Sequence, residues 1–291
     1  MMPAPDQQFD STRQSDTSSV PMKASTRERV TGVDIRIDRA GEGPTLVVLN
    51  GLLGINVHWF GCLGPLISRA EVLLLQPPLL EMRGPGCSVG GVTNLIASVL
   101  ETLTDEPAVI VGNSLGGHVA LRLALERPEL VRGIVLAGSS GLFERSFEKG
   151  IEHNPSRDWL DKKISDLFYS RESMHPNMID DAYAELSRRP SARALVRLGR
   201  SAKNDHLGDR LHEIKIPVLL AWGRNDVVTP PSVAEKFHDL LPDSRLRWID
   251  KCGHAPQIER PEILGNYIAD FLDELAQAGA WDTQGANQGA A

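Results

Sequence analysis

The sequence predicts an α/β protein with a mostly parallel central sheet, flanking helices and a helical insertion. Three observations predict it. Short runs rich in Val, Ile and Leu recur along the chain, amphipathic segments of helical length separate many of them, and one long stretch contains no strand-like run. Apolar runs of this kind are typical of strands covered on both faces, and their alternation with helices favours parallel strands joined by right-handed crossovers.

The expected strands begin with Val33–Asp38, which alternates with a period of two and precedes a Gly-Glu-Gly-Pro turn at 41–44. The later strands are predominantly apolar and are expected at Leu46–Leu49, Val72–Leu75, Val109–Val111, Ile134–Leu136, Val218–Trp222 and Leu246–Ile249. Amphipathic patterns predict helices over Val92–Leu103, Gly117–Glu126 and Val233–Leu240.

Residues 29–141 and 213–276 are expected to form the core, and residues 142–212 a helical cap over the edge of the sheet. The cap stretch is about 70 residues long, which is too long for an ordinary connection between two strands. Residues 1–28 are rich in Ser, Thr, Asp, Gln and Pro, so we expect a disordered N-terminal tail. Residues 277–291 are rich in Ala, Gly and Gln and are expected to form a flexible C-terminal tail.

The composition is that of a soluble globular protein. The 291 residues are 41% hydrophobic and 24% charged, and the formal net charge of −7 argues against nucleic acid as a partner. No apolar run reaches the roughly 18 residues of a membrane span, and the polar start does not resemble a secretory signal. Cys62, Cys87 and Cys252 show no metal-ligand spacing, which favours a cytoplasmic setting. The sequence does not indicate an oligomeric state.

The segment around Ser114 indicates a nucleophile. An apolar strand leads into Gly112-Asn113-Ser114-Leu115-Gly116 and then into a helix, which is the context that a Gly-x-Ser-x-Gly motif requires. Glycines at 112 and 116 allow strand and helix to approach closely. The helix N-terminus beside Ser114 favours developing negative charge.

A serine nucleophile needs a base, and the base needs an acceptor that orients it. Of the eight histidines, His254 lies just after the last expected strand, at the edge where parallel sheets place their sites. Asp226 follows the preceding strand, 28 residues earlier (254 − 226), which leaves room for one helix and one strand. We therefore expect Ser114, His254 and Asp226 to act together as nucleophile, base and orienting acid. Asp226 could otherwise cap the next helix, and Asp250 is the rival acid.

The tetrahedral intermediate of acyl transfer carries an oxyanion that needs two hydrogen-bond donors. The backbone N–H of Leu115, directly after the nucleophile, is one expected donor. The other is assigned to the N–H of Leu52 in the glycine-containing loop 50–54. Neither a metal nor an organic cofactor is expected, because no His, Cys or Asp cluster has ligand spacing.

The chain resembles the α/β-hydrolase superfamily over about residues 29–275. The resemblance rests on Gly-Asn-Ser-Leu-Gly-Gly at 112–117, Trp-Gly-Arg-Asn-Asp at 222–226, Cys-Gly-His-Ala-Pro at 252–256, and the order Ser, Asp, His along the chain. These motifs are similar to those of the cofactor-free subgroup of carboxylesterases and meta-cleavage-product hydrolases. Dehalogenases and epoxide hydrolases of this fold carry Asp at the position of Ser114, which disfavours those activities.

Two departures from the family pattern bear on the site. Asn50-Gly51 stands where the family has His-Gly, although Asn can still hydrogen-bond the loop. The family's Asp-x-x-Gly-x-Gly-x-Ser is replaced by a segment that begins Gln76-Pro77-Pro78, so we expect the loop there to be reshaped.

Three functions compete at this point. The leading one is hydrolysis of a small or medium carboxylic ester or thioester, a small-molecule substrate. The second is cleavage of a carbon–carbon bond in a vinylogous keto acid, with a cap arginine binding the substrate carboxylate. Its basis is the spacing of Arg189, Arg193, Arg197 and Arg200, which puts them on one helical face; a solvated basic face is the plainer interpretation. The third is a binding protein without activity.

Overall fold

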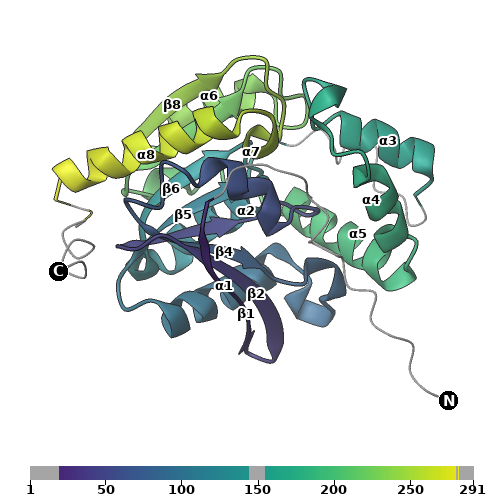
Figure 1. Cartoon of the computed structure of the whole chain (residues 1–291), viewed down its shortest axis with the longest axis horizontal. Coiled ribbons are helices and arrows are strands. Elements are labelled where there is room, and N and C mark those ends of the chain that lie inside the picture. The colour runs from purple at the N-terminus through teal and green to yellow at the C-terminus, as the bar shows by residue number, and fades with distance from the viewer. Residues whose placement is uncertain (1–19, 144–154, 280, 282–291) are drawn as a thin grey trace.

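The chain forms one eight-stranded sheet with helices on both faces (Figure 1). The structure is a computed structural model, and it describes residues 20–143, 155–279 and 281. The strand order is β1-β2-β4-β3-β5-β6-β7-β8. The strands are β1 (Met22–Val30), β2 (Val33–Ala40), β3 (Thr45–Leu49), β4 (Glu71–Gln76), β5 (Ala108–Asn113), β6 (Val131–Ala137), β7 (Val218–Gly223) and β8 (Ser244–Ile249).

The predicted α/β class with a mostly parallel sheet is confirmed. Strands β3 to β8 pair in parallel, whereas β1 pairs antiparallel with β2, and β2 antiparallel with β4. Strands β3 to β7 consist almost wholly of buried residues, as their apolar sequences predict. The loops after β5, β6, β7 and β8 therefore gather at one edge of the sheet.

The structure differs from the predicted N-terminal tail at strand β1. Residues 1–28 were expected to be disordered, but Met22–Val30 pairs with β2 along its length. The hairpin turns at Thr31-Gly32, and both residues have positive φ values, 48° and 84°. Two such residues form the turn type that matches the twist of a hairpin. The strand was missed because its inward positions include Thr26 and Glu28, so its alternation is not hydrophobic.

The flanking helices form two layers. One face of the sheet packs against α1 (Val89–Leu103), α2 (Leu115–Glu126) and α6 (Pro231–Leu240), and the other against η1 (Asn56–Cys62) and α8 (Pro261–Gln277). Helix α1 begins where the Ser88 side chain accepts a hydrogen bond from the Gly91 N–H, an N-cap. Short helices complete the core: η2 (Leu79–Glu81), η3 (Gly84–Gly86), η4 (Pro128–Leu130), η7 (Leu211–Glu213) and α7 (Pro256–Glu259).

Between β6 and β7 the described residues contain no strand, and four helices precede η7 there. They are α3 (Arg157–Ser165), η6 (Arg171–Ser173), α4 (Met178–Leu186) and α5 (Arg189–Asn204), which lie together at the right of Figure 1. They share a small apolar cluster that includes Leu160, Ile164 and Leu186. Ala255, which follows His254 in the chain, belongs to the same cluster, so these helices pack against the loop after β8. Part of the predicted cap, residues 144–154, lies outside the described residues.

The C-terminal boundary also differs from the prediction. Gln277 is the last residue of α8 rather than the start of a tail. Trp281 is 1% exposed, belongs to the apolar core that also contains residues of η1 and α8, and donates from Nε1 to the carbonyl of Arg69. No helix among the described residues has the length and apolar character needed to cross a membrane.

Candidate active site

Ser114 lies at a sharp turn between β5 and α2. Its backbone has φ 52° and ψ −117°, a conformation that side-chain-bearing residues rarely adopt. Such strain costs of order 1–3 kcal/mol and persists only where the surrounding structure enforces it. The turn has the strand–turn–helix geometry that the Gly-x-Ser-x-Gly motif predicts, and Ser114 immediately precedes the first helical residue, Leu115.

There is no space for a side chain at Gly112 or Gly116, so this turn requires glycine at both motif positions. A Cβ atom on Gly112 would lie 2.3 Å from the carbonyl carbon of Gly116, and one on Gly116 would lie 2.3 Å from the carbonyl oxygen of Leu49. Both separations are far below van der Waals contact. Strand β5, helix α2 and the loop after β3 therefore approach backbone to backbone around Ser114.

His254 and Asp226 form a buried pair. His254 Nδ1 lies 2.9 Å from Asp226 Oδ2, and the two residues are 4% and 2% exposed. An ionised carboxylate only accepts hydrogen bonds, so this contact favours the tautomer with the proton on Nδ1 and leaves Nε2 as the acceptor. That is the arrangement a general base needs.

The loop after β7 holds the Asp226 carboxylate in place. Its Oδ1 accepts from the N–H groups of Val228 and Thr229, and its Oδ2 accepts from Thr229 Oγ1. Thr229 in turn is anchored because its carbonyl accepts from Trp222 Nε1 at 2.8 Å. The sequence analysis did not identify Thr229, whose hydroxyl also lies 3.2 Å from His254 Nδ1. Asp226 thus shapes its own turn as well as contacting His254, rather than capping α6.

Asn113 connects the elbow to the histidine loop. Its Nδ2 donates to the carbonyls of Ala137 and His254, at 2.7 and 2.9 Å, and its Oδ1 accepts from Gln257 Nε2. A Cβ on Gly138, just after β6, would lie 3.0 Å from His254 Nδ1 and 3.1 Å from Asp226 Oδ2. The ends of four adjacent strands therefore bring the residue next to Ser114 into contact with the His254 loop.

Asp250, the rival acid, points away from this cluster. It is 82% exposed and pairs with Arg224 Nε at 2.7 Å. Cys252 lies nearer, but burial, and secondarily the charge of Glu259, raises the pKa of its thiol to about 12. A thiol with that pKa is not ionised near neutral pH and is not a nucleophile.

The expected oxyanion loop lies against the elbow. The Gly54 N–H donates to the Gly51 carbonyl and closes a tight turn that contains Leu52. A Cβ on Gly51 would lie 3.2 Å from Ser114 Cβ, which measures how close the turn comes to the serine. Leu115 is the first residue of α2, so the helix itself does not use its N–H.

Asn50 is the first departure from the family pattern, and both its Nδ2 and its Oδ1 have hydrogen-bond partners. Its Nδ2 donates to Asn56 Oδ1 and to the carbonyl of Leu75, and its Oδ1 accepts from Trp59 Nε1. Asn56 in turn donates to the buried carboxylate of Asp38. Gln76, part of the second departure, accepts from the Asn56 N–H at 2.9 Å. The substituted residues thus form one network that fixes the loop, which the sequence did not reveal.

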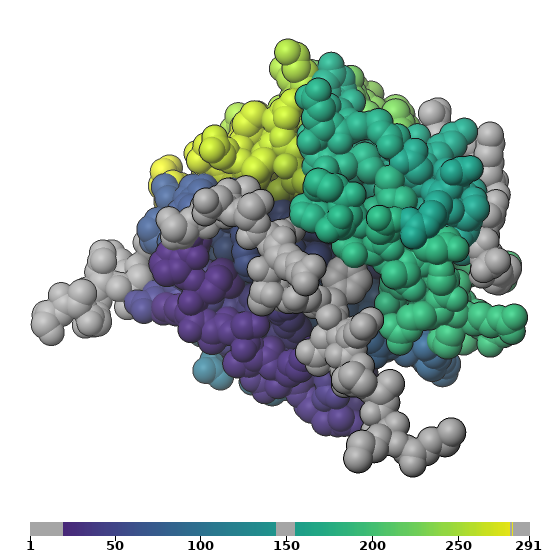
Figure 2. Space-filling model, turned by 45° about the vertical axis from the view of Figure 1, so that its right-hand side comes forward, coloured from purple at the N-terminus to yellow at the C-terminus, as the bar shows by residue number. Residues whose placement is uncertain are grey.

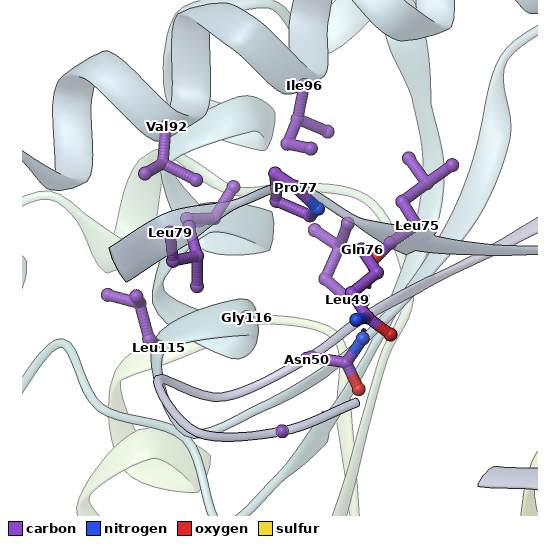
Figure 3. A pocket seen from close by; sticks show the side chains of 12 residues that line it. Leu49, Asn50, Leu75, Gln76, Pro77, Leu79, Val92, Ile96, Leu115 and Gly116 are labelled. Carbon is purple, nitrogen blue, oxygen red and sulfur yellow. Dashed lines mark hydrogen bonds between the residues drawn. The ribbon is translucent and has the colours of Figure 1, made fainter. Parts of the chain in front are cut away.

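A small pocket lies beside this loop and the start of α2 (Figure 3). Its lining is mainly apolar and includes Leu115, the residue after Ser114, with Asn50 and Gln76 at one side. The remaining lining residues are Leu49, Gly54, Leu75, Pro77, Leu79, Val92, Ile96, Gly116 and Val119.

The four arginines singled out in the insertion lie on α5 and are exposed. The opposite face of α5, which includes Ala194, Leu195 and Leu198, is buried against the rest of the protein. The basic face therefore points to solvent, which favours the plainer interpretation over binding of a substrate carboxylate in a closed site. Within the described ranges, no three His, Cys, Asp or Glu side chains come together to hold a metal ion.

His118, the histidine nearest to Ser114 in sequence, is buried and lies on α2. Its Nε2 is 3.0 Å from Asp205 Oδ2, just beyond α5. Burial alone would raise the pKa of Asp205, but the contacts with His118 and Arg122 outweigh it and lower that pKa to about 2. His118 thus joins α2 to the end of α5.

Comparisons with known proteins agree with this fold. The family described as alpha/beta hydrolase fold matches residues 44–261. A crystal structure of MGS-MChE2, an alpha/beta hydrolase from a sediment metagenome of the Mar Chica lagoon in Morocco, is 30% identical. The match covers 83% of this chain and 96% of that one, with a TM-score of 0.67.

Two curated relatives have named activities. The pimeloyl-[acyl-carrier protein] methyl ester esterase of Nitrosomonas europaea is 31% identical over 78% of this chain and 95% of its own length. The 2-hydroxy-6-oxononadienedioate/2-hydroxy-6-oxononatrienedioate hydrolase of Comamonas testosteroni is 27% identical over 82% and 91%. The first is named for an ester, the second for a dienedioate.

Proposed function

Because the chain belongs to the α/β-hydrolase family, we propose that this hydrolase is a serine hydrolase with Ser114 as nucleophile, His254 as base and Asp226 as the orienting acid. The observation that carries the proposal is the buried His254–Asp226 pair, whose loop is bonded to Asn113 beside the strained Ser114. Strain at a serine is expected where it holds the hydroxyl for attack.

The reaction proceeds in two halves. Ser114 Oγ attacks the carbonyl carbon of the substrate while His254 Nε2 takes the hydroxyl proton. The oxyanion is stabilised by the N–H groups of Leu52 and Leu115. His254 then gives its proton to the leaving alcohol or thiol, which leaves an acyl group on Ser114. A water molecule, deprotonated by His254, attacks this acyl-enzyme, and His254 returns the proton to Ser114 Oγ as the acid is released.

The substrate proposed is a small or medium carboxylic ester or thioester. The apolar pocket beside Leu115 favours an uncharged acyl group next to the reacting carbonyl. The relative from Nitrosomonas europaea is named as a methyl ester esterase, which agrees with this class. The mechanism needs neither metal nor organic cofactor, because the side chains supply both nucleophile and base. The three cysteines are free and buried, which fits a cytoplasmic enzyme.

Carbon–carbon bond cleavage in a vinylogous keto acid is the second candidate. The Comamonas testosteroni relative, named for a dienedioate, favours it. The exposure of the α5 arginines removes the feature of this chain that supported a carboxylate-binding cap. Ester hydrolysis therefore remains the first choice.

A fluorophosphonate probe tests the nucleophile, and a substrate panel tests the class. The probe should label the purified protein covalently, and Ser114→Ala should remain unlabelled and lose on the order of 10^4-fold or more in turnover. The panel contains acyl esters of graded chain length and one carboxylated dienone. Normal ester turnover by Ser114→Ala would overturn the proposal, and faster turnover of the dienone than of any ester would favour the second candidate.

A further inference from the structure

Glu259 is a buried carboxylate that accepts hydrogen bonds from three backbone N–H groups. It is the last residue of α7 and is 6% exposed. Its Oε2 accepts from the Gly253 N–H at 2.5 Å, and its Oε1 accepts from the N–H groups of Tyr169 and Ser170 at 2.8 and 3.1 Å. Hydrogen bonds to a charged acceptor are roughly twice as strong as neutral ones, so the three together are a strong local constraint.

These donors come from two distant parts of the chain. Gly253 immediately precedes His254, whereas Tyr169 and Ser170 follow α3 in the insertion between β6 and β7. The two segments also bond directly, because the His254 N–H donates to the Leu167 carbonyl at 2.8 Å. Figure 2 shows the teal insertion and the yellow C-terminal part meeting at the surface. Oε2 of Glu259 thus bonds to the histidine loop and Oε1 bonds to the insertion, so this side chain bridges the junction between the two segments.

The contact at this junction is close as well as bonded. A Cβ on Gly253 would lie 2.7 Å from the Leu167 carbonyl oxygen and 2.9 Å from the carbonyl carbon of Phe168. A side chain at 253 would therefore push the insertion away from the histidine loop. This close contact requires glycine at position 253. It also uses both carboxylate oxygens of Glu259, one for each of the two segments.

We infer that Glu259 is a positioning residue of the reaction: it joins segment 167–170 of the insertion to the Gly253–His254 backbone, so that the imidazole is placed correctly only when the insertion is seated. This inference rests on the proposed function. Glu259 touches no reacting atom and acts through the histidine loop. A displacement of about 1 Å at a reacting group can cost on the order of 10²-fold in rate.

The sharpest variant is Glu259→Gln, which keeps the shape of the side chain. An amide has one accepting oxygen, and its NH2 group would face an N–H on one side of the junction. Glu262→Gln is the matched control, because Glu262 lies three residues later and is exposed. For the smallest ester of the panel, which needs the fewest contacts with the insertion, we expect kcat of Glu259→Gln to fall 10- to 100-fold with KM changed less than about 3-fold. The rate of fluorophosphonate labelling should fall in parallel, and the control should match the wild type.

A purely structural role would lower the unfolding temperature without this selective loss of kcat and labelling rate. A folded Glu259→Gln protein with kcat and labelling rate within 2-fold of wild type would overturn the inference. If that variant does not fold, Gly253→Ala tests the same junction from the other side, because its Cβ would collide with Leu167. It should lose kcat similarly, and full activity in folded Gly253→Ala would also overturn the inference. A wild-type protein that the probe does not label would instead contradict the proposed function itself.

Discussion

Asn113 Nδ2 lies 2.9 Å from the carbonyl oxygen of His254, so the residue before the proposed nucleophile is hydrogen-bonded to the backbone of the proposed base. The same amide group donates to Ala137 at the end of β6, and its oxygen accepts from Gln257 in α7. One side chain therefore sets the spacing between the elbow and the histidine loop. Asn113 occupies the first x position of the Gly-x-Ser-x-Gly motif, and in this chain that position has a defined structural role.

Asn113→Ala should lower kcat/KM for esters by about 10- to 100-fold, because the histidine loop loses its bond to the elbow. It should also destabilise the protein by about 1–3 kcal/mol, since buried carbonyls lose their donor. Steady-state kinetics and urea unfolding measure the two effects. Asn94→Ala, at an exposed position of α1, is the control: kcat/KM should stay unchanged, and stability should rise by about 0.5 kcal/mol because Ala is the better helix former. Unchanged kcat/KM in Asn113→Ala would mean that the bond to His254 has no bearing on catalysis.

Asp226→Asn should lower the turnover of esters by roughly 10^4-fold while the protein stays folded. The amide can present an NH2 group to His254 Nδ1, which favours the tautomer with the proton on the wrong nitrogen. Asp250→Asn is the control, because that carboxyl is exposed and pairs with Arg224. If Asp226→Asn kept most of its activity while Asp250→Asn lost it, the orienting acid would be wrongly assigned.

The sequence predicted those parts of the fold and site that follow from local patterns. Buried Val and Ile runs predicted the central strands, and a glycine pair around Ser114 predicted the elbow. Strand β1 was missed because its pairing with β2, and not its hydrophobicity, determines its conformation. The bonds of Asn113 to His254 and of Glu259 to Tyr169 join residues 141 and 90 positions apart. No single-sequence pattern connects such distant donors and acceptors, so these residues emerged only from the folded chain.

Neutralising two of the α5 arginines should leave ester hydrolysis within about 2-fold of wild type. Arg193 and Arg197 lie one helical turn apart on the exposed face, where like charges repel. The double variant Arg193→Gln, Arg197→Gln should therefore unfold at the same or a slightly higher temperature, since Gln is also a good helix former. Kinetics on the ester panel and a thermal melt measure both. Selective loss of activity on the carboxylated dienone would instead support carbon–carbon bond cleavage as the function.

His58 should make the protein less stable as the pH falls below about 6.5. Burial, and secondarily the neighbouring His175, lowers the pKa of His58 to about 4 in the folded state, against 6.5 for a free imidazole. Above pH 6.5 both states are neutral at this residue. Between pH 6.5 and 4 the unfolded chain binds a proton that the folded chain does not, so the free energy of unfolding decreases. Below pH 4 both states are protonated and the loss stays constant.

The expected loss between pH 7 and pH 5 from this residue is about 2 kcal/mol, since a shift of one pKa unit corresponds to 1.36 kcal/mol. Urea unfolding at the two pH values measures the free energies, and the difference between wild type and His58→Gln isolates the contribution of His58. The variant should lose clearly less stability over this interval than wild type. His212→Gln, at an exposed position of η7, is the control and should follow the wild type. If His58→Gln loses as much stability as wild type, then the imidazole is not held neutral in the η1 segment, and other groups produce the pH dependence.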